Sequence, residues 1–530
     1  MSSSTRASAS EHDAEVVVVG GGHNGLICAA YLARAGLDTI VVEARPTVGG
    51  CASTESIWGV RFNICNCDHT MIRAMPVIDE LELADHGLRY LEPESGYVSL
   101  FHDGSTPWVN FFDPEQTLEG LAAAYPGEVD GYRRYVADAV PVIELVIEMA
   151  KAPTTAPGLA RTAMARGSKA AARLLAWSRR SMVDVLSDYF DAWQLIMPAA
   201  SMGPTVWGVS PTTPGTGLAA ALYALRHVVR TGRPVGGSGA LPDAVAAAFA
   251  AAGGRVQCES RVQRLLVDDE RIHGVELAGG QRVTAPVVVA AYDPQRVFVD
   301  WLGEAPARAR KMAQRWRERP VADGYESKVD AVLTRAPRYR AMDELEARHP
   351  GIALDQTTSL VAPSPDELAR AHQLRAEGRV DDHPTFMVNV PTVLDPSMAP
   401  EGTHVLSLET LFTPYELVGG WPGSSEPQRW LDVWSRLVEP GTLDIERWRA
   451  MTPDVYETEF GMHRGYTPSY GGAPLATLVG RSPETSRYRT AIDGLYLTGA
   501  ATFPGAGIFG APGRNTAGAV LADLGCGPRR

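Results

Sequence analysis

The chain has 530 residues, of which 45% are hydrophobic and 21% charged, the balance of a folded globular protein rather than a disordered or fibrous one. This length predicts two or more domains, or one domain interrupted by another. The net charge of −13 argues against a nucleic-acid partner, because phosphate backbones are bound by basic surfaces.

The apolar runs and the cysteines of the sequence indicate the cellular compartment and whether a metal site is expected. Residues 1–13 contain no apolar run, so we expect a flexible leader rather than a secretory signal or a membrane anchor. No stretch approaches the roughly 18 consecutive apolar residues that span a bilayer. Six scattered cysteines fit a reducing cytoplasm, and the close pair Cys65 and Cys67 lacks a second ligand cluster, so no metal site is expected. We therefore expect a cytoplasmic protein, at most peripheral to a membrane.

The first recognisable pattern is a strand, a glycine motif and a helix. Residues 15–19 (EVVVV) predict a strand, and residues 26–35 predict the helix that the glycines open. A second apolar run over 39–42 ends in Glu43, where an acidic side chain can accept hydrogen bonds from a ribose. The motif between strand and helix spans Gly20, Gly22, His23, Asn24 and Gly25. Together these parts predict a dinucleotide site with the pyrophosphate at the helix N-terminus.

Residues 161–180 combine six basic residues with Met164, Leu174, Leu175 and Trp177. The short, alanine-diluted apolar stripe favours the solvated face of a lid helix. A helix lying on a membrane surface and an oligomer contact are the alternatives.

Residues 236–291 predict another piece of the nucleotide-binding domain. A Gly-Gly pair leads into an alanine-rich helix, and apolar runs over 255–266, 274–277 and 285–291 predict strands. The stretches 76–234 and 301–484 remain for a second domain of mixed strands and helices.

Near the C-terminus, residues 494–499 predict a strand that leads into a second GxGxxG at 505–510. Pro512 and the few residues that follow leave no room for a second nucleotide-binding unit. These glycines instead allow the backbone to approach a flat ring system, with the N-terminus of a helix over 511–524 facing it.

The segment EARPTVGGC after the second strand resembles flavin enzymes with the glutathione-reductase-like FAD fold. With LYLTGAATFPGAGIFGAPGRN near the C-terminus, the chain is similar to the phytoene desaturase and carotenoid oxidoreductase family. It especially resembles the branch related to pyridine nucleotide-disulfide oxidoreductase domain-containing proteins. The resemblance continues through GGGHNGL, SPTTPGTG, PVGGSGALPD and LDPSMAPEGTHVLSL, and so covers nearly the whole chain.

This resemblance implies an α/β fold with a discontinuous FAD-binding Rossmann domain and an inserted mixed α+β substrate domain. The FAD domain is expected over 14–75, 235–300 and 485–530, and the substrate domain over 76–234 and 301–484. Besides the first glycine motif and Glu43, the residues expected at FAD are Ala44, Arg45, Gly49, Gly50, Cys51, Val262, Gly499, Ala500, Gly507 and Ile508. Of these, Val262 would place a backbone group on the adenine, and Cys51 fills a tight turn more readily than it carries a covalent flavin.

The sequence departs from the family pattern at two positions, and these departures limit which family properties can be assigned to this chain. Ala500 stands where many relatives have an acidic residue on the ribityl chain, so flavin binding would depend on backbone donors. Phe503 stands where carotenoid desaturases commonly have a histidine, so a carotenoid reaction does not follow from the resemblance. The chain also lacks a paired redox cysteine close to the first glycine motif and a second nucleotide-binding unit for NADPH, which argues against disulfide reduction.

In the family, the segment after the Gly-Gly pair runs past the flavin ring, and here it is residues 61–69. Asp68 and His69 are therefore the candidate acid/base pair, with an exposed turn capped by Asp68 as the alternative. His463 is a second acid/base candidate, which would reach the flavin from the opposite side. The alternative is that His463 has a purely structural role.

The implied function is FAD-dependent removal of hydride from a largely apolar small molecule, as a dehydrogenase, desaturase or oxidase of natural-product or carotenoid-like metabolism. Oxygen, a quinone or another acceptor would reoxidise the flavin. A non-redox flavin-dependent isomerase or cyclase and a non-catalytic flavin-binding scaffold are the alternatives.

Overall fold

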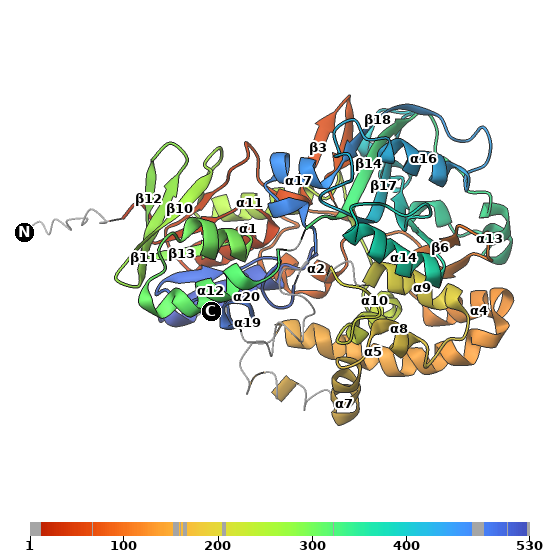
Figure 1. Ribbon diagram of the computed structural model, residues 1–530, viewed down its shortest axis with the longest axis horizontal. Helices are drawn as coiled ribbons and strands as arrows, with labels where there is room; N and C mark the ends of the chain where they lie inside the picture. Colours follow the sequence, from red (N-terminus) through yellow and green to blue (C-terminus); the bar gives the residue numbers. More distant parts are fainter. Residues whose placement is uncertain are drawn as a thin grey trace, which may run out of the picture.

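The computed structural model describes residues 12–65, 67–151, 158, 161–162, 167–203, 208–321, 323–468, 482–505 and 507–526. One half of the molecule is built on a parallel five-stranded sheet whose strands come from the beginning, middle and end of the chain (Figure 1). In spatial order the strands are β19 (Leu495–Leu497), β13 (Val287–Ala290), β1 (Val16–Val19), β2 (Thr39–Val42) and β9 (Arg255–Gln257). This is the arrangement of a Rossmann-like domain assembled from separate segments.

The central strand β1 is four valines, all buried, as expected of a parallel strand covered on both faces. Val16 and Val18 face a hydrophobic cluster shared with three helices: α1 (His23–Arg34), α11 (Ala240–Ala251) and α20 (Ala511–Asp523). Val17 and Val19 face the opposite cluster, which includes the small antiparallel sheet of β10 (Val262–Asp268), β11 (Arg271–Leu277) and β12 (Arg282–Thr284). Helix α12 (Arg310–Glu318), from a stretch assigned by sequence to the substrate domain, also packs in this second cluster.

The other half is built on a mixed seven-stranded sheet. Its order is β18 (Ile445–Met451), β14 (Tyr325–Leu333), β17 (His404–Thr413), β16 (Phe386–Asn389), β15 (Thr358–Ala362), β6 (Tyr97–Phe101) and β7 (Trp108–Asn110). Only the pair β15 and β6 is parallel among these described neighbours. Because its strands come from both of the long stretches left over by the nucleotide-binding segments, this sheet joins them into one body.

The two faces of the larger sheet have different coverings. On the outer face, Val329, Leu406 and Leu408 pack with the buried Trp430 and Trp434, and α13 (Met342–Arg348) and α16 (Glu426–Ser435) cover it. On the inner face, Val332 and Val405 pack with Val60 and Phe62 of the hairpin formed by β3 (Thr54–Ile57) and β4 (Val60–Asn63). The inner face is therefore turned toward the segment that follows the first glycine motif.

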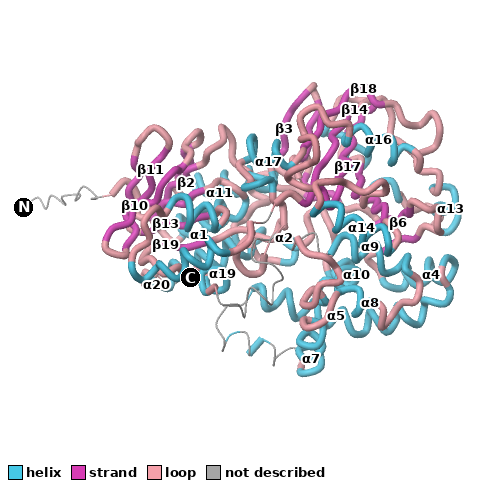
Figure 2. The backbone as a smooth tube through the Cα atoms, in the orientation of Figure 1, coloured by secondary structure: helices cyan, strands magenta, loops and turns pink. Residues whose placement is uncertain are grey.

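Helices fill the remaining space, and Figure 2 shows α4, α5, α7 and α8 together beneath the larger sheet. They are α2 (Met71–Ala74), α3 (Val77–Glu80), α4 (Pro114–Ala124), α5 (Val129–Lys151), α7 (Ser168–Trp177), α8 (Met182–Leu186), α9 (Trp193–Met202), α10 (Leu222–Val228), α14 (Pro365–Ala376), α15 (Pro391–Leu394), α17 (Pro453–Phe460) and α19 (Pro483–Arg487). A short hairpin of β5 (Tyr90–Leu91) and β8 (Arg233–Pro234) completes the set. No helix in the described ranges is long and apolar enough to cross a membrane.

The basic segment 161–180 is described only in part, since residues 163–166 lie outside the described ranges. Within α7, Leu174 and Trp177 are buried in the protein core, whereas Leu175 is 52% exposed. Arg173 forms an ion pair with Asp138 of α5, 2.8 Å away. Much of the apolar stripe of this helix therefore packs inward.

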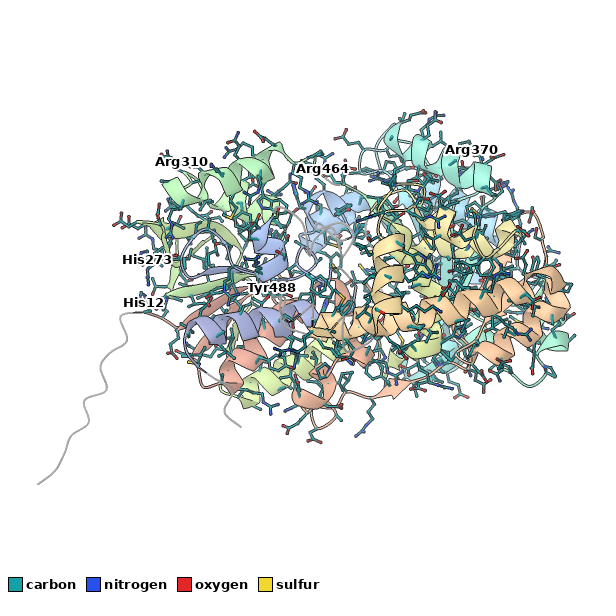
Figure 3. All side chains as sticks on the ribbon, turned by 90° about the horizontal axis from the view of Figure 1, so that it is seen from below. His12, His273, Arg310, Arg370, Arg464 and Tyr488 are labelled. Carbon is teal, nitrogen blue, oxygen red and sulfur yellow. The ribbon has the colours of Figure 1, made fainter. Side chains whose placement is uncertain are left out.

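The two halves meet near Arg464, which follows α17 (Figure 3). In that view Arg310 of α12 and Arg370 of α14 lie toward opposite ends of the molecule, with Arg464 between them. The Arg464 guanidinium lies 3.1 Å from carboxylate oxygens of both Asp323 and Glu416. These exposed or half-exposed ion pairs tie the segment after α17 to the start of β14.

Candidate functional site

The glycines between β1 and α1 make a turn that leaves no room for side chains at two positions. Gly20 has φ +102°, and a Cβ on Gly25 would lie 2.1 Å from the Gly20 carbonyl oxygen. A Cβ on Gly22, by contrast, would meet no atom within 4 Å. Gly25 is thus required for helix-to-strand packing, and Gly22 leaves open space at the N-terminus of α1, where an anion is favoured.

Glu43 stands at the end of β2, as predicted for a ribose-binding acid. Its carboxylate is buried and accepts backbone hydrogen bonds from Gly21 at 2.6 Å and Arg45 at 2.8 Å. The Glu43 backbone carbonyl accepts from the Ser260 N–H at 2.7 Å, which brings the segment before Val262 beside it. Val262 begins β10 with its side chain buried in the hydrophobic cluster, so its backbone contact with adenine remains a prediction.

The structure brings the two ends of the chain together at the first glycine motif. The Ile72 N–H donates to the Ile508 carbonyl at 2.9 Å, and a Cβ on Gly513 would lie 2.3 Å from the Asn24 carbonyl oxygen. Burial lowers the pKa of His23 to about 4, against the effect of a hydrogen bond to the Gly507 backbone. His23 is therefore a neutral side chain that links the motif to the C-terminal segment.

Further predicted residues line the same region. Gly499 follows β19 with φ +92° and precedes Ala500, and it lies next to Ala291, the residue after β13. A Cβ on Gly507 would meet no atom within 4 Å, so the backbone there is open to a ligand, as at Gly22. These open positions at two glycine-rich segments fit a cofactor that is held largely by backbone groups.

The segment EARPTVGGC is anchored by its own side chains. The Arg45 guanidinium pairs with Glu55 at 3.0 Å and lies over the Phe460 ring, whereas Ala44 is half-buried. Gly49 donates its N–H to the Gly21 carbonyl at 2.8 Å, and Gly50 packs against Gly22. Cys51 is partly exposed, with its thiol 3.3 Å from the Met462 sulfur.

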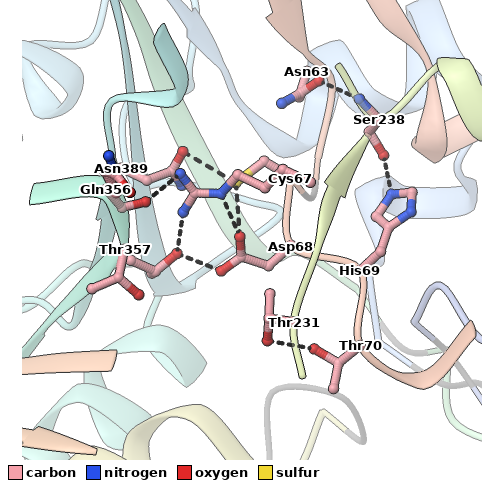
Figure 4. Close-up of polar contacts among 12 residues, drawn as sticks. Asn63, Cys67, Asp68, His69, Thr70, Thr231, Ser238, Gln356, Thr357 and Asn389 are labelled. Carbon is pink, nitrogen blue, oxygen red and sulfur yellow. Dashed lines mark hydrogen bonds and ion pairs between the residues drawn. The ribbon is translucent and has the colours of Figure 1, made fainter. Parts of the chain in front are cut away.

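Asp68 is held in an ion pair rather than in an exposed turn (Figure 4). Its carboxylate accepts from the Arg233 Nε at 2.6 Å and from the Thr358 hydroxyl at 2.6 Å, and the Arg233 side chain is 4% exposed. Burial raises the pKa of Asp68, but the Arg233 charge and these hydrogen bonds outweigh burial, so the pKa lies below its ordinary value. This carboxylate is fully engaged in joining residues 61–69, which we call the crossing segment, to β8 and β15.

His69 points away from Asp68 toward Ser238 (Figure 4). The ring is fully buried, with Nε2 2.8 Å from the Ser238 hydroxyl and Nδ1 2.9 Å from the Tyr90 hydroxyl. Burial lowers the pKa of His69 to about 3, so the ring is neutral near pH 7. The structure does not bring Asp68 and His69 together as a pair, and each has structural partners of its own.

We expect His69→Gln to cost stability and leave the pH profile of turnover unchanged. The substitution disturbs two buried hydrogen bonds, which costs about 1–3 kcal/mol of unfolding free energy. Thermal denaturation measures this loss, and turnover between about pH 5 and 9 tests for a catalytic ionisation. Loss of one limb of the pH profile in the variant would instead assign His69 an acid/base role.

His463 lies in the turn after α17. Its Nδ1 is 3.6 Å from the Glu457 carboxylate, and its pKa is lowered by burial and by the Arg296 charge. The neighbouring Met462 contacts Cys51, but the His463 ring lies among charged groups of both halves, including Arg296 after β13 and Glu457 on α17. A catalytic role for His463 therefore remains a prediction.

Charged side chains on β14 and β17 were missed by sequence reasoning. Glu326, Lys328 and Asp330 alternate along β14, and Glu409 lies on the neighbouring β17, so all four share the inner face of the larger sheet. The sequence signal is their period of two within strands that are otherwise apolar. Lys328 donates to the Asn63 carbonyl and pairs with Asp330, which fastens the sheet to the end of β4.

The chain is similar to several known proteins. Residues 18–73 match the model of the NAD(P)-binding Rossmann-like domain. The chain is 30% identical to rat (Rattus norvegicus) pyridine nucleotide-disulfide oxidoreductase domain-containing protein 2, over 97% of this chain and 94% of that protein. It is 27% identical to one of the polypeptides of limonene dehydrogenase from Castellaniella defragrans (96% and 95% covered) and 25% identical to a lycopene-forming phytoene desaturase of Pseudescherichia vulneris (96% and 99% covered).

Solved structures share the fold at lower identity. A putrescine oxidase bound to putrescine superposes with a TM-score of 0.62 at 17% identity, covering 96% of this chain and 99% of that one. This likeness confirms the α/β architecture with a Rossmann-like nucleotide-binding domain and a second mixed domain.

Proposed function

Because the chain belongs to the family of the phytoene desaturases and pyridine nucleotide-disulfide oxidoreductase domain-containing protein 2, we propose that it is an FAD-dependent oxidoreductase acting on a largely apolar small molecule. The proposed cofactor, FAD, would be held by the two glycine-rich segments, and the proposed substrate would lie between the nucleotide-binding half and the larger sheet.

The observation that supports FAD most directly is the meeting of the N-terminal and C-terminal glycine segments. Open space at Gly22 and Gly507, the N-terminus of α1 and the Glu43 carboxylate form a continuous set of groups suited to a dinucleotide. The backbone bridge between Gly22 and Gly49 fixes EARPTVGGC beside them. FAD, when bound there, would supply the hydride acceptor.

An apolar cluster on the inner face of the larger sheet supports an apolar substrate. Tyr97, Met202 and Leu360 are buried together, and the partly buried Leu222 and Met387 pack against them. These side chains come from β6, α9, β15, α10 and β16, so both long stretches of the chain contribute. Side chains of this kind would hold a hydrocarbon body and exclude water from the reacting carbon.

The Asp68–Arg233 pair and the His69–Ser238 hydrogen bond give the crossing segment a positioning role in this proposal. They tie residues that follow β4 to β8, β15 and the loop before α11. Because the segment is held at both ends, it keeps the nucleotide-binding half and the larger sheet at a constant separation. A constant separation is required if a substrate is to be oriented over a cofactor.

The visible spectrum of the purified protein is the first test of this proposal. We expect an oxidised flavin spectrum, release of FAD on denaturation, and reversible bleaching on anaerobic reduction. Reoxidation within seconds of admitting oxygen would identify an oxidase, and reoxidation over minutes would identify a dehydrogenase with another acceptor. A protein that carries no flavin, even after incubation with FAD, would contradict the proposed function.

A further inference from the structure

Four polar side chains lie together on the inner face of the larger sheet, and we call Glu326, Asn389, Ser407 and Glu409 the polar patch. The strand register pairs Asn389 with Ser407 and Met387 with Glu409, so these side chains project from one face. Lys328 is directly opposite Glu409, which makes Glu326 and Glu409 diagonal neighbours about 7–8 Å apart between their Cα atoms. The patch therefore spans three adjacent strands, β14, β17 and β16.

The patch retains access although its surroundings are buried. Glu326 and Glu409 are partly exposed, whereas Lys328 and Asp330 on the same face are 1% and 0% exposed. Met387, directly opposite Glu409, is also partly exposed and packs against the apolar cluster of Tyr97, Met202 and Leu360. Accessible polar atoms thus adjoin the apolar side chains proposed to hold the substrate.

Several polar atoms of the patch have no protein partner among the described residues. Lys328 pairs with Asp330 at 2.8 Å and donates to the Asn63 carbonyl, and among the described residues the Glu409 carboxyl has no ion pair or hydrogen bond of its own. Asn389 accepts the Cys67 thiol at 3.1 Å through Oδ1, but within the described ranges its Nδ2 has no hydrogen-bond partner. Ser407 is 4% exposed and Asn389 is 7% exposed, but neither the Ser407 hydroxyl nor the Asn389 Nδ2 is among the fully buried unpaired atoms of the described residues, so both keep access to a ligand or to water.

We propose that the polar patch binds an uncharged oxygen-bearing group, a hydroxyl or a carbonyl, on an otherwise apolar substrate. The inference rests on the proposed function and specifies the substrate class. Asn389 and Ser407 offer hydrogen-bond donors, and the two carboxyl groups offer a donor and an acceptor when they share one proton. A pure hydrocarbon would fill the adjacent apolar cluster but leave these groups unpaired, which disfavours it strongly.

The electrostatic surroundings favour a shared proton. Burial raises the pKa of Glu409 to about 8, with the Glu326 charge adding to it and the Lys328 charge opposing it, and burial raises the pKa of Glu326 to about 7. Other titratable groups that act on these two carboxyls come from every element packed against them: Asp330 and Tyr325 on β14, Cys65, Cys67 and Asp68 on the crossing segment, Cys51 before it, Tyr456 on α17, and Tyr466 after α17. Proton loss as the pH rises through 7 to 8 would remove the carboxyl donor, so affinity for the oxygenated ligand is expected to fall there.

Matched ligands that share one carbon skeleton test the proposal. Limonene, perillyl alcohol, perillaldehyde and perillylamine are titrated into the purified holoprotein by calorimetry, alongside the series myrcene, geraniol, geranial and geranylamine. We expect an alcohol or aldehyde to bind at least about tenfold more tightly than its hydrocarbon, a difference of about 1.4 kcal/mol. In Glu409→Gln combined with Ser407→Ala, this preference should fall below about twofold while hydrocarbon binding is retained.

A matched control variant lies one residue away. Thr410 is fully buried on the outer face of β17, with its hydroxyl unpaired among the described residues, so Thr410→Val alters the same strand without touching the patch. We expect this variant to keep the wild-type preference and stability. Circular dichroism distinguishes misfolding of the double variant from loss of recognition.

Three results would overturn the proposal. They are equal binding of hydrocarbon and alcohol to the wild type, tightest binding by an amine, and no binding by any oxygenated member of either series. A protein that carries no flavin would contradict the proposed function, whereas a flavin-bound protein with any of these three results would contradict only the role of the polar patch.

Discussion

Gly25→Ala is expected to abolish FAD binding by distorting and destabilising the nucleotide-binding half. The added Cβ would lie 2.1 Å from the Gly20 carbonyl oxygen, which is backbone and cannot rotate away. Overpacking of this kind costs about 1–3 kcal/mol, and a rigid backbone contact places the cost at or above the upper end. Thermal denaturation of the cofactor-free protein measures the loss, and the visible spectrum reports the missing flavin.

Gly22→Ala is the matched comparison for this effect. Its Cβ would meet no atom within 4 Å, so the cofactor-free variant should unfold at the wild-type temperature. The methyl group would nevertheless occupy space where the pyrophosphate approaches the backbone, so we expect FAD affinity to fall by at least about tenfold. Normal FAD affinity in Gly22→Ala would show that the cofactor lies elsewhere.

Arg233→Met is expected to be the most destabilising substitution outside the glycine motif. It leaves the Asp68 carboxylate buried with two uncharged partners, the Thr358 hydroxyl and the Cys67 thiol, and it also removes a 2.8 Å hydrogen bond to the Gln356 carbonyl. Removal of one partner of a buried ion pair costs about 3–5 kcal/mol. Denaturant titration at neutral pH measures this cost.

Two further measurements identify the cause of that loss. The double variant Asp68→Asn with Arg233→Met should recover part of the stability, because no unpaired charge remains. The ion pair lowers the folded-state pKa of Asp68, so its contribution exists above the unfolded pKa of about 4 and is lost as the pH falls. The gap between wild type and Arg233→Met should therefore narrow below about pH 4, and a constant gap would point to lost packing instead.

The dinucleotide-binding half was predictable from local signals. Three local features predicted it: a run of β-branched residues, glycines at fixed spacing, and an acid after the next strand. Each feature is explained by the geometry of a dinucleotide site, and the structure has β1, α1, β2 and Glu43 at the predicted positions. The resemblance implied that Gly507 and Ile508 share one site with the first motif, and backbone groups of both residues lie beside it, whereas their contact with FAD stays a prediction.

The inner face of the larger sheet was much less predictable. Asp68 was a plausible base because it is polar in a buried segment, but its partner Arg233 is 165 residues away and has no local signature. Glu409 and Asn389 meet only through the pairing of β16 with β17, and strand pairing across long stretches cannot be read from periodicity. The pairing of distant strands, rather than residue type, determines which polar side chains are paired with other protein groups and which keep unpaired hydrogen-bonding atoms.

The order of strands in the five-stranded sheet also has a consequence for biosynthesis. β1 ends at Val19, but β19, which completes the sheet beside β13, begins only at Leu495. At about 5–20 residues per second, the ribosome needs from roughly half a minute to more than a minute to make the chain between them. The sheet of nucleotide-binding strands must therefore remain incomplete during the whole of that interval, and the complete cofactor site can form only after β19 has been made.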